Sequence, residues 1–315
     1  MNRSQGREES VLATWLEAYI DVESVTQVLH RYYELIKPRI ALLIVISTSV
    51  GYSYGVGQHF NLVTFFHALL GTALMAAGSA TLNQWYERDL DAQMTRTKMR
   101  PIPAGTITPR QAFTFGVGVS VIGVLELLVF VNALAAGLGL LTAVGYLFAY
   151  TPLKRKSPIC TTIGAFPGAM PPLIGYAAAS GHLTVQAWVL FAILFLWQFP
   201  HFHAIAWLYR EEYEKAGIKM LAVVKPRGSA LNLEILTALL LLIPATLAPT
   251  FLHMAGKVYF AAAVVLNLAF LYFGVQMSRE HDRSRARKLL LASVIYVPLL
   301  FTFLVIDNPR FTALF

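Results

Sequence analysis

Long apolar stretches alternate with short polar segments along most of this chain. Nine of the stretches are long enough to cross the hydrocarbon core of a bilayer as helices. They are Ile40–Val56, Leu62–Leu82, Ala112–Val131, Ala133–Tyr150, Cys160–Ala179, Ala187–Trp207, Leu231–Leu252, Val258–Gln276 and Leu289–Val305. The pattern predicts an all-α, polytopic membrane protein whose nine transmembrane helices form one domain, residues 37–315.

The first 36 residues follow a different pattern, in which apolar and charged positions are mixed. Leu12, Trp15 and Tyr19 are interleaved with Glu17 and Asp21. This mixture predicts an amphipathic helix that lies at the membrane surface. The alternative is a short cytoplasmic helix without membrane contact.

The basic residues occupy alternate loops. Of the 25 lysines and arginines, 23 lie in the amino-terminal segment or in the loops after spans two, four, six and eight. The other two are Lys257, in the loop after span seven, and Arg310, after span nine. Short loops rich in lysine and arginine stay on the cytoplasmic side. We therefore expect a cytoplasmic amino terminus and an external carboxy terminus. One span too many or too few would break this alternation.

Composition limits further which partners, disulfides and locations the protein can have. The net charge is +8, but charged residues make up only 13% of the chain and sit in short loops between apolar spans, which argues against nucleic acid as a partner. A single cysteine, Cys160, excludes an internal disulfide. No arginine- and serine-rich, acid-free segment precedes Leu12, so a bacterial inner membrane is expected rather than a mitochondrial one.

Oxygen-bearing side chains cluster where the second span ends. If that helix continues, Asn83, Glu87 and Asp91 follow one another at intervals of four and share one face. Mg²⁺ prefers such ligands and commonly completes its shell with phosphate oxygens of a substrate. The alternative is a solvated, charged helix end without a metal.

Cations that could bind phosphate lie near this cluster and in the loop after span four. Arg96 and Arg100 follow the acidic face, and Lys154 and Arg155 follow Tyr150. Arginine binds phosphate oxygens bidentately. For the loop after span four, a simple topology anchor is the alternative.

The loop after span six adds a second acidic cluster, with Glu211 and Glu212 downstream of His201 and His203. Two acidic clusters among excess cations favour a site where metal ions bridge carboxylates to a polyanion. The histidines are two positions apart, so they could bind one metal jointly only outside a helix. Glu126, within span three, is a functional candidate without an evident partner.

The fifth span is interrupted by Pro167, Pro171 and Pro172. Proline removes backbone hydrogen bonds, and broken helix at membrane depth is tolerated where it lines a cavity or is buried in protein. A packing kink is the alternative, although one proline would suffice for it.

Four segments together resemble the UbiA-type intramembrane prenyltransferases, and more narrowly their heme-farnesylating branch. They are NQWYERDLDAQMTRTKMRPIPAG from Asn83, LIKPRIALL from Leu35, YTPLKRKSPICTTIGAFPGAMPPLIGY from Tyr150 and WQFPHFHAIAWLYREEYEKAGIKML from Trp197. They cover about a third of the chain in the family's order. Cys160 and Ala222 depart from the asparagine and proline expected there, and the second acidic motif has adjacent glutamates, which leaves open which of Glu211 and Glu212 contacts a metal.

This resemblance implies a nine-helix fold around a central cavity, Mg²⁺ as cofactor, and farnesyl diphosphate and heme b as substrates that yield heme O and pyrophosphate. It implies the bilayer as environment and the downstream heme A synthase as a possible partner. The residues implied for catalysis are Asn83, Glu87, Asp91, Glu211 and Glu212, with Asn83, Glu87, Asp91 and Glu212 as metal ligands. Those implied for substrate binding are Lys37, Arg39, Arg96, Arg100, Tyr150, Lys154, Arg155 and His201.

Two other functions are consistent with parts of the pattern. A prenyltransferase that acts on an aromatic quinone precursor would share the logic of the first acidic motif. A transporter with a cation-coupled acidic site would instead show internal repeats. The segments around the two acidic clusters are dissimilar, which weakens the transporter hypothesis.

Overall fold

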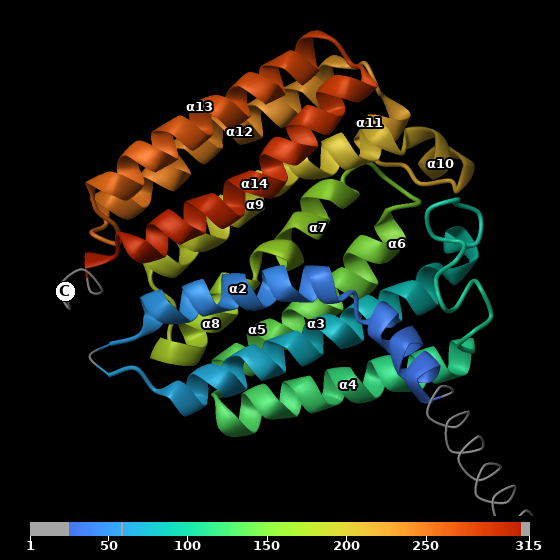
Figure 1. Cartoon of the computed structure of the whole chain (residues 1–315), viewed down its shortest axis with the longest axis horizontal. Coiled ribbons are helices and arrows are strands. Elements are labelled where there is room, and N and C mark those ends of the chain that lie inside the picture. Colours follow the sequence, from blue (N-terminus) through green and yellow to red (C-terminus); the bar gives the residue numbers. More distant parts are fainter. Residues whose placement is uncertain (1–24, 58, 310–315) are drawn as a thin grey trace, which may run out of the picture.

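The computed structural model describes residues 25–57 and 59–309, and these residues form a bundle of long helices (Figure 1). The amphipathic segment predicted for residues 1–36 therefore lies largely outside the described residues, and its last part is the helix Val25–Leu35. The further elements are α2 (Pro38–Gly55), α3 (Leu62–Asp91), α4 (Pro109–Phe130), α5 (Ala133–Val144), the π-helix η1 (Gly145–Tyr150), α6 (Thr151–Leu153), α7 (Cys160–Ala169), α8 (Pro171–Ser180), α9 (Val185–Leu208), α10 (Arg210–Lys215), α11 (Leu221–Val224), α12 (Ser229–Phe251), α13 (Lys257–Arg279) and α14 (Arg283–Ile306).

Each of the nine predicted spans corresponds to helix. Within the described residues, seven helices are long and apolar enough to cross a membrane, and α2 makes an eighth when it is joined to Val25–Leu35 across a 55° bend. The remaining span, the fifth in the predicted order, is the pair α7 and α8, two helices of 10 residues each that are separated at Met170. The predicted break is present where Pro171 and Pro172 begin the second half-helix, whereas Pro167 lies inside α7.

The loops that carry most of the basic residues gather at one end of the bundle. Figure 1 shows the end of α3, the short helices α10 and α11 and the connection from α13 to α14 at the same side, opposite the end of α14. Helices α9, α12, α13 and α14 make one half of the bundle, and α2, α3, α4, α5 and α8 make the other. This arrangement brings segments distant in sequence together at the basic end.

Close packing between α2 and the half-helix α8 depends on three glycines. A Cβ at Gly51 would lie 2.0 Å from the backbone oxygen of Pro172, and a Cβ at Gly175 would lie 1.9 Å from that of Thr48. Gly55 makes a similar approach to Tyr176. Small residues at intervals of four allow helix backbones to touch in membranes, where van der Waals packing drives helix association.

Replacing Gly51 with alanine is expected to separate α2 from α8 and to lower the free energy of unfolding by about 1–3 kcal/mol, because the neighbouring atom is backbone and cannot move aside. Thermal unfolding of the purified protein in detergent measures the effect. Gly118→Ala on α4 is the matched control, since a Cβ there meets no atom within 4 Å. Equal melting temperatures for the two variants would contradict the packing argument.

The intramembrane carboxyl group of Glu126 has a partner that the sequence did not reveal. Its Oε1 lies 2.6 Å from Nδ1 of His67, so the pair joins α4 to α3. The His67 ring also stacks on Phe130, with ring centroids 4.6 Å apart. A polar contact between neighbouring spans accounts for the carboxyl group, at a place far along α3 from its charged end.

Candidate functional site

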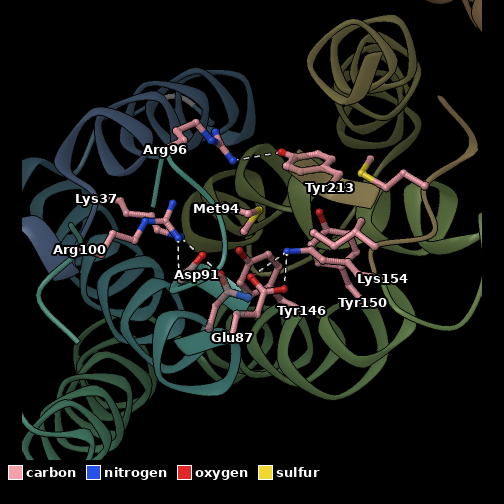
Figure 2. A pocket seen from close by; sticks show the side chains of 13 residues that line it. Lys37, Glu87, Asp91, Met94, Arg96, Arg100, Tyr146, Tyr150, Lys154 and Tyr213 are labelled. Atoms are coloured by element: carbon pink, nitrogen blue, oxygen red, sulfur yellow. Dashed lines mark hydrogen bonds and ion pairs between the residues drawn. The ribbon is translucent and has the colours of Figure 1, made fainter. Parts of the chain in front are cut away.

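A polar pocket of about 150 Å³ opens at the basic end of the bundle, where the last turns of α3 meet η1, α6 and the loop after α10 (Figure 2). This volume is below the roughly 300–1,000 Å³ of sites that enclose a whole drug-sized ligand. It suits a small polar group. The lining residues are Lys37, Asn83, Glu87, Asp91, Met94, Arg96, Arg100, Tyr146, Tyr150, Lys154, Tyr213, Ile218 and Met220.

The acidic face of α3 forms one wall of the pocket. The helix runs without interruption from Leu62 to Asp91, because its amino terminus is capped by Asn61 and no proline or glycine interrupts its last turns. The predicted continuation of the second span is thereby confirmed. Asn83, Glu87 and Asp91 share one face and are 2%, 8% and 2% exposed. They are part of the wall and are shielded from solvent.

Both carboxylates are paired with cations that come from other parts of the chain. Nζ of Lys154 donates to Glu87 at 2.8 Å, and Nη1 of Arg100 donates to Asp91 at 2.7 Å. Burial alone would lower the pKa of Lys154, but the Glu87 carboxylate and the tyrosines Tyr150 and Tyr146 together outweigh burial and hold this pKa well above its usual value. Lys154 is therefore a permanent cation in the pocket (Figure 2).

Lys37 completes the cationic side. Its Nζ donates to Oδ1 of Asn83 at 3.4 Å, and Nδ2 of Asn83 donates in turn to Thr151. Burial, together with the neighbouring charges of Arg100 and Lys154, lowers the pKa of Lys37 to about 7. With Arg96, four basic side chains line the pocket against two carboxylates. The surplus of positive charge favours an anionic ligand.

The π-helix η1 places two tyrosines on the pocket wall. Tyr146 and Tyr150 lie four residues apart with ring centroids 5.4 Å from each other, and Nζ of Lys154 lies 4.6 Å from the Tyr150 centroid. Gly164 makes room for this ring, since a Cβ there would lie 2.5 Å from it. π-Helical turns are rare and occur often at functional sites. This one presents two aromatic faces beside the cations.

Arg96, in the loop after α3, connects this loop to α10, which carries the second acidic motif. Its backbone N–H donates to Oε2 of Glu212 at 3.3 Å, and its guanidinium donates to the hydroxyl of Tyr213 at 3.1 Å. The guanidinium also lies over the ring of Tyr209, 4.8 Å from the centroid. Glu212 thus supports the pocket from its edge and is not among the residues that line it.

The structure keeps four of the predicted site residues away from the pocket. Arg39 and Arg155 are exposed, and Glu211 is exposed and pairs with its neighbour Arg210. His201 lies farther along α9, where its Nδ1 is 2.8 Å from Oγ of Ser293 and its ring stacks on Trp197. The remaining predicted residues, except Glu212, line the pocket together.

Five lining residues were not predicted: Met94, Tyr146, Tyr213, Ile218 and Met220. Two of them carried a usable signal. Tyr146 precedes Tyr150 by four positions, which suggests a shared helix face, and Tyr213 directly follows the second acidic pair. The other three are apolar side chains in loops, whose positions depend on tertiary packing.

The oxygen-bearing side chains of the pocket fit a magnesium ion that is bound together with a diphosphate. In the part of the chain that the structure describes, no three histidine, cysteine, aspartate or glutamate side chains converge on one point as a complete metal cage. Mg²⁺ is usually bound through one or two carboxylates and substrate phosphates rather than by such a cage. Glu87 and Asp91, with the amide oxygen of Asn83 beside them, fit this mode when a diphosphate supplies the other oxygens.

Sequence comparison relates the chain to a known protein family. Residues 44–302 match the UbiA prenyltransferase family. The protoheme IX farnesyltransferase of Solibacter usitatus is 49% identical over 287 residues, which are 88% of this chain and 98% of that protein. The protoheme IX farnesyltransferase of Aquifex aeolicus is 39% identical, over 92% and 99% of the two chains.

Solved structures with the same fold were found at low sequence identity. A digeranylgeranylglyceryl phosphate synthase superposes with a TM-score of 0.75 at 18% identity, over 89% of this chain and 98% of its own. A UbiA homolog from Archaeoglobus fulgidus, bound to GPP and Mg²⁺, superposes with a TM-score of 0.60 at 16% identity, over 87% and 99%.

Proposed function

The chain belongs to the UbiA prenyltransferase family and groups there with protoheme IX farnesyltransferases; on that premise, we propose that the pocket at the end of α3 binds the diphosphate of the prenyl donor. The observation that carries this proposal is the convergence of four basic side chains and two carboxylates on one small pocket at the end of a membrane-spanning bundle. An isoprenoid diphosphate has the matching shape, with a compact polyanionic head and an apolar tail.

The protein is a multi-pass membrane enzyme, and its reaction joins farnesyl diphosphate, heme b and water to give heme O and pyrophosphate. The carbon–oxygen bond between the farnesyl chain and the diphosphate breaks. A vinyl group of heme b forms the new carbon–carbon bond, and water adds to the resulting porphyrin-side cation as a hydroxyl group, with loss of one proton. No strong nucleophile is required from the protein.

The residues of the pocket favour departure of the diphosphate. Lys154 and Arg100 are charged and preorganised, so they stabilise the negative charge that develops on the leaving oxygen without reorganisation. Lys37 approaches the same space from the connection between the helix Val25–Leu35 and α2, and Arg96 approaches it from the loop after α3. Mg²⁺, held by Asn83, Glu87 and Asp91, would neutralise further charge on the phosphate oxygens.

The aromatic wall has a separate role in the proposal. The rings of Tyr146 and Tyr150 stand beside the cations, where the allylic carbon would lie once the diphosphate is bound. Aromatic faces attract cations, and excluding water from this position protects the allylic cation from premature capture. Heme b would then approach from the apolar side of the pocket.

The basic end of the bundle faces the cytoplasm in this proposal, because it carries most of the lysines and arginines. Pyrophosphate would leave to that side, and heme O would remain in the bilayer. Transfer of heme O to a heme A synthase is consistent with these positions and belongs to the proposal.

The acceptor is tested by supplying the purified protein with farnesyl diphosphate, Mg²⁺ and two acceptors, heme b and 4-hydroxybenzoate. Mass spectrometry is expected to find farnesylated, hydrated heme and no prenylated benzoate. Chelation of divalent metal with EDTA is expected to abolish product formation, and added Mg²⁺ to restore it. A prenylated benzoate in place of heme O would make the protein a quinone-precursor prenyltransferase.

The adjacent glutamates Glu211 and Glu212 are expected to respond differently to the same substitution. Glu212→Gln should raise the KM for farnesyl diphosphate severalfold, because the charged Glu212 carboxylate accepts the backbone N–H of Arg96 at the edge of the pocket and a neutral amide oxygen would hold it less strongly. Glu211→Gln should leave the KM unchanged, since its carboxylate is exposed and pairs only locally with Arg210. Steady-state kinetics at saturating heme measures both, and a larger effect at Glu211 would reverse the assignment.

A further inference from the structure

The joint between the helix Val25–Leu35 and α2 has an unusual backbone at Lys37. Lys37 adopts a left-handed conformation, with φ 49° and ψ 63°, and the two helices meet there at 55°. A residue with a side chain pays a conformational cost in this region, and such residues cluster at functional sites where the surroundings impose them. A glycine would form the same joint without strain, so the lysine side chain has another use.

A buried glutamine on α3 fixes this joint. Gln84 is 1% exposed, and its Nε2 donates to the backbone oxygen of Leu35 at 2.7 Å. The next residue toward the amino terminus, Asn83, accepts from Nζ of Lys37. Two consecutive residues of α3 therefore hold the backbone just before Lys37 and the end of the Lys37 side chain.

The other side of the joint packs against the loop that follows α3. Leu35 is fully buried in a small cluster with Ile102, Ile107 and Ala112. Nη1 of Arg31 contacts the backbone oxygen of Thr106. The joint is thereby enclosed between α3 and the segment that begins just after Arg100, another cation of the pocket.

These contacts restrict the Lys37 side chain to fewer positions than a lysine side chain would otherwise sample. A lysine side chain has many rotamers, and ordering it costs up to about 2 kcal/mol. Here the strained backbone aims the side chain, and the Gln84 contact keeps the backbone from relaxing into an ordinary conformation.

We propose that Gln84 is a positioning residue for the prenyl-diphosphate site: its hydrogen bond to the Leu35 carbonyl holds the left-handed joint that delivers the Lys37 ammonium group to the diphosphate. This inference rests on the proposed function of the pocket. Gln84 itself does not contact the substrate, so its effect on binding of the prenyl diphosphate passes through Lys37.

The test is a double-mutant cycle on the full-length protein, with Gln84→Met, Lys37→Met and the double variant. Methionine fills the space of the glutamine side chain and removes the hydrogen-bond donor, the Nε2 amide. Dissociation constants for farnesyl diphosphate and for inorganic pyrophosphate are measured by titration, and the KM for heme b is measured alongside. Gln198→Met is the matched control, because Gln198 is 3% exposed and also donates from Nε2 to a backbone oxygen, that of Ala165, on helices remote from the joint.

Each single variant is expected to weaken binding of both diphosphates about tenfold, and the double variant is expected to be no weaker than Lys37→Met alone. The KM for heme b should not change in Gln84→Met, and Gln198→Met should retain wild-type pyrophosphate affinity. Additive losses in the double variant would overturn the inference, since Gln84 would then act independently of Lys37. So would an unchanged affinity in Gln84→Met.

Two further outcomes separate this inference from the proposed function. If Lys37→Met binds diphosphate normally while the wild type makes heme O, the positioning role falls and the function stands. If the wild type forms no prenylated heme, the proposed function falls. Should Gln84→Met fail to fold, Gln84→Asn carries the same comparison, because it keeps the amide but withdraws it by one methylene group from the Leu35 oxygen.

Discussion

Asp91→Asn is expected to reduce heme O formation by about 10²–10³-fold, the loss typical when a preorganised electrostatic contact to a transition state is removed. Asp91 lies at the end of the acidic face of α3, 2% exposed, and its Oδ2 accepts from Arg100 at 2.7 Å. Asparagine keeps the shape but loses the charge that would bind a metal. Single-turnover assays with excess enzyme measure the chemical step directly.

The same substitution leaves the Arg100 guanidinium without its partner, so a folding defect must be distinguished from a catalytic one. Removing one member of a fully buried ion pair typically costs about 3–5 kcal/mol of stability, and the loss should be smaller here because the Arg100 side chain is 27% exposed. The double variant Asp91→Asn/Arg100→Gln removes both charges and should recover most of the melting temperature but none of the activity. Near wild-type activity of folded Asp91→Asn would exclude Asp91 as a metal ligand.

Lys154→Gln and Arg155→Gln compare two adjacent cations of the same loop. Lys154 is in the pocket with its Nζ 2.8 Å from Glu87, whereas Arg155 is exposed. We expect the first change to lower kcat/KM for farnesyl diphosphate by about 10²-fold, since it removes a charge-assisted contact to the leaving group. The second should change it less than twofold, because an exposed charge is screened by solvent.

Lys154→Arg is the control that keeps the positive charge of the side chain and changes its shape. Arginine keeps the pairing with Glu87 but places a planar group near the Tyr150 ring, so partial activity is expected. Circular dichroism and size-exclusion profiles verify that all three variants are folded. Equal losses at Lys154 and Arg155 would mean that only the overall charge of the loop matters, and would contradict the pocket as the site of diphosphate binding.

Sequence periodicity predicted the parts of the site that lie on one continuous helix. Asn83, Glu87 and Asp91 could be placed on a common face because a helix repeats every 3.6 residues and nothing in the sequence interrupts α3 before Asp91. The one-sided distribution of basic residues likewise predicted that the loops after even-numbered spans meet at one end. Both arguments depend on local geometry, which a sequence encodes directly.

Pairings between distant segments could not be predicted in this way. Nothing in the spacing of the sequence indicates that Lys154 would pair with Glu87, 67 residues away, or that Arg155 beside it would face outward. Such choices depend on how η1 and α6 rotate against α3, and the π-helical turn changes that rotation. His201 is a similar case, because its contact with Ser293 requires the packing of α14 on α9.

The divided span formed by α7 and α8 has a consequence for membrane insertion during synthesis. Neither half, at 10 residues, is long enough to cross the bilayer, and three prolines interrupt their backbone hydrogen bonds. Lipid offers such half-helices no polar partners, so they depend on neighbouring helices: Gln198 of α9 donates to the Ala165 oxygen, and α2 packs closely on the Pro172 backbone at Gly51. The segment should therefore leave the translocon only when α2 is already in place and α9 has been made, which ties completion of the catalytic bundle to the order of translation.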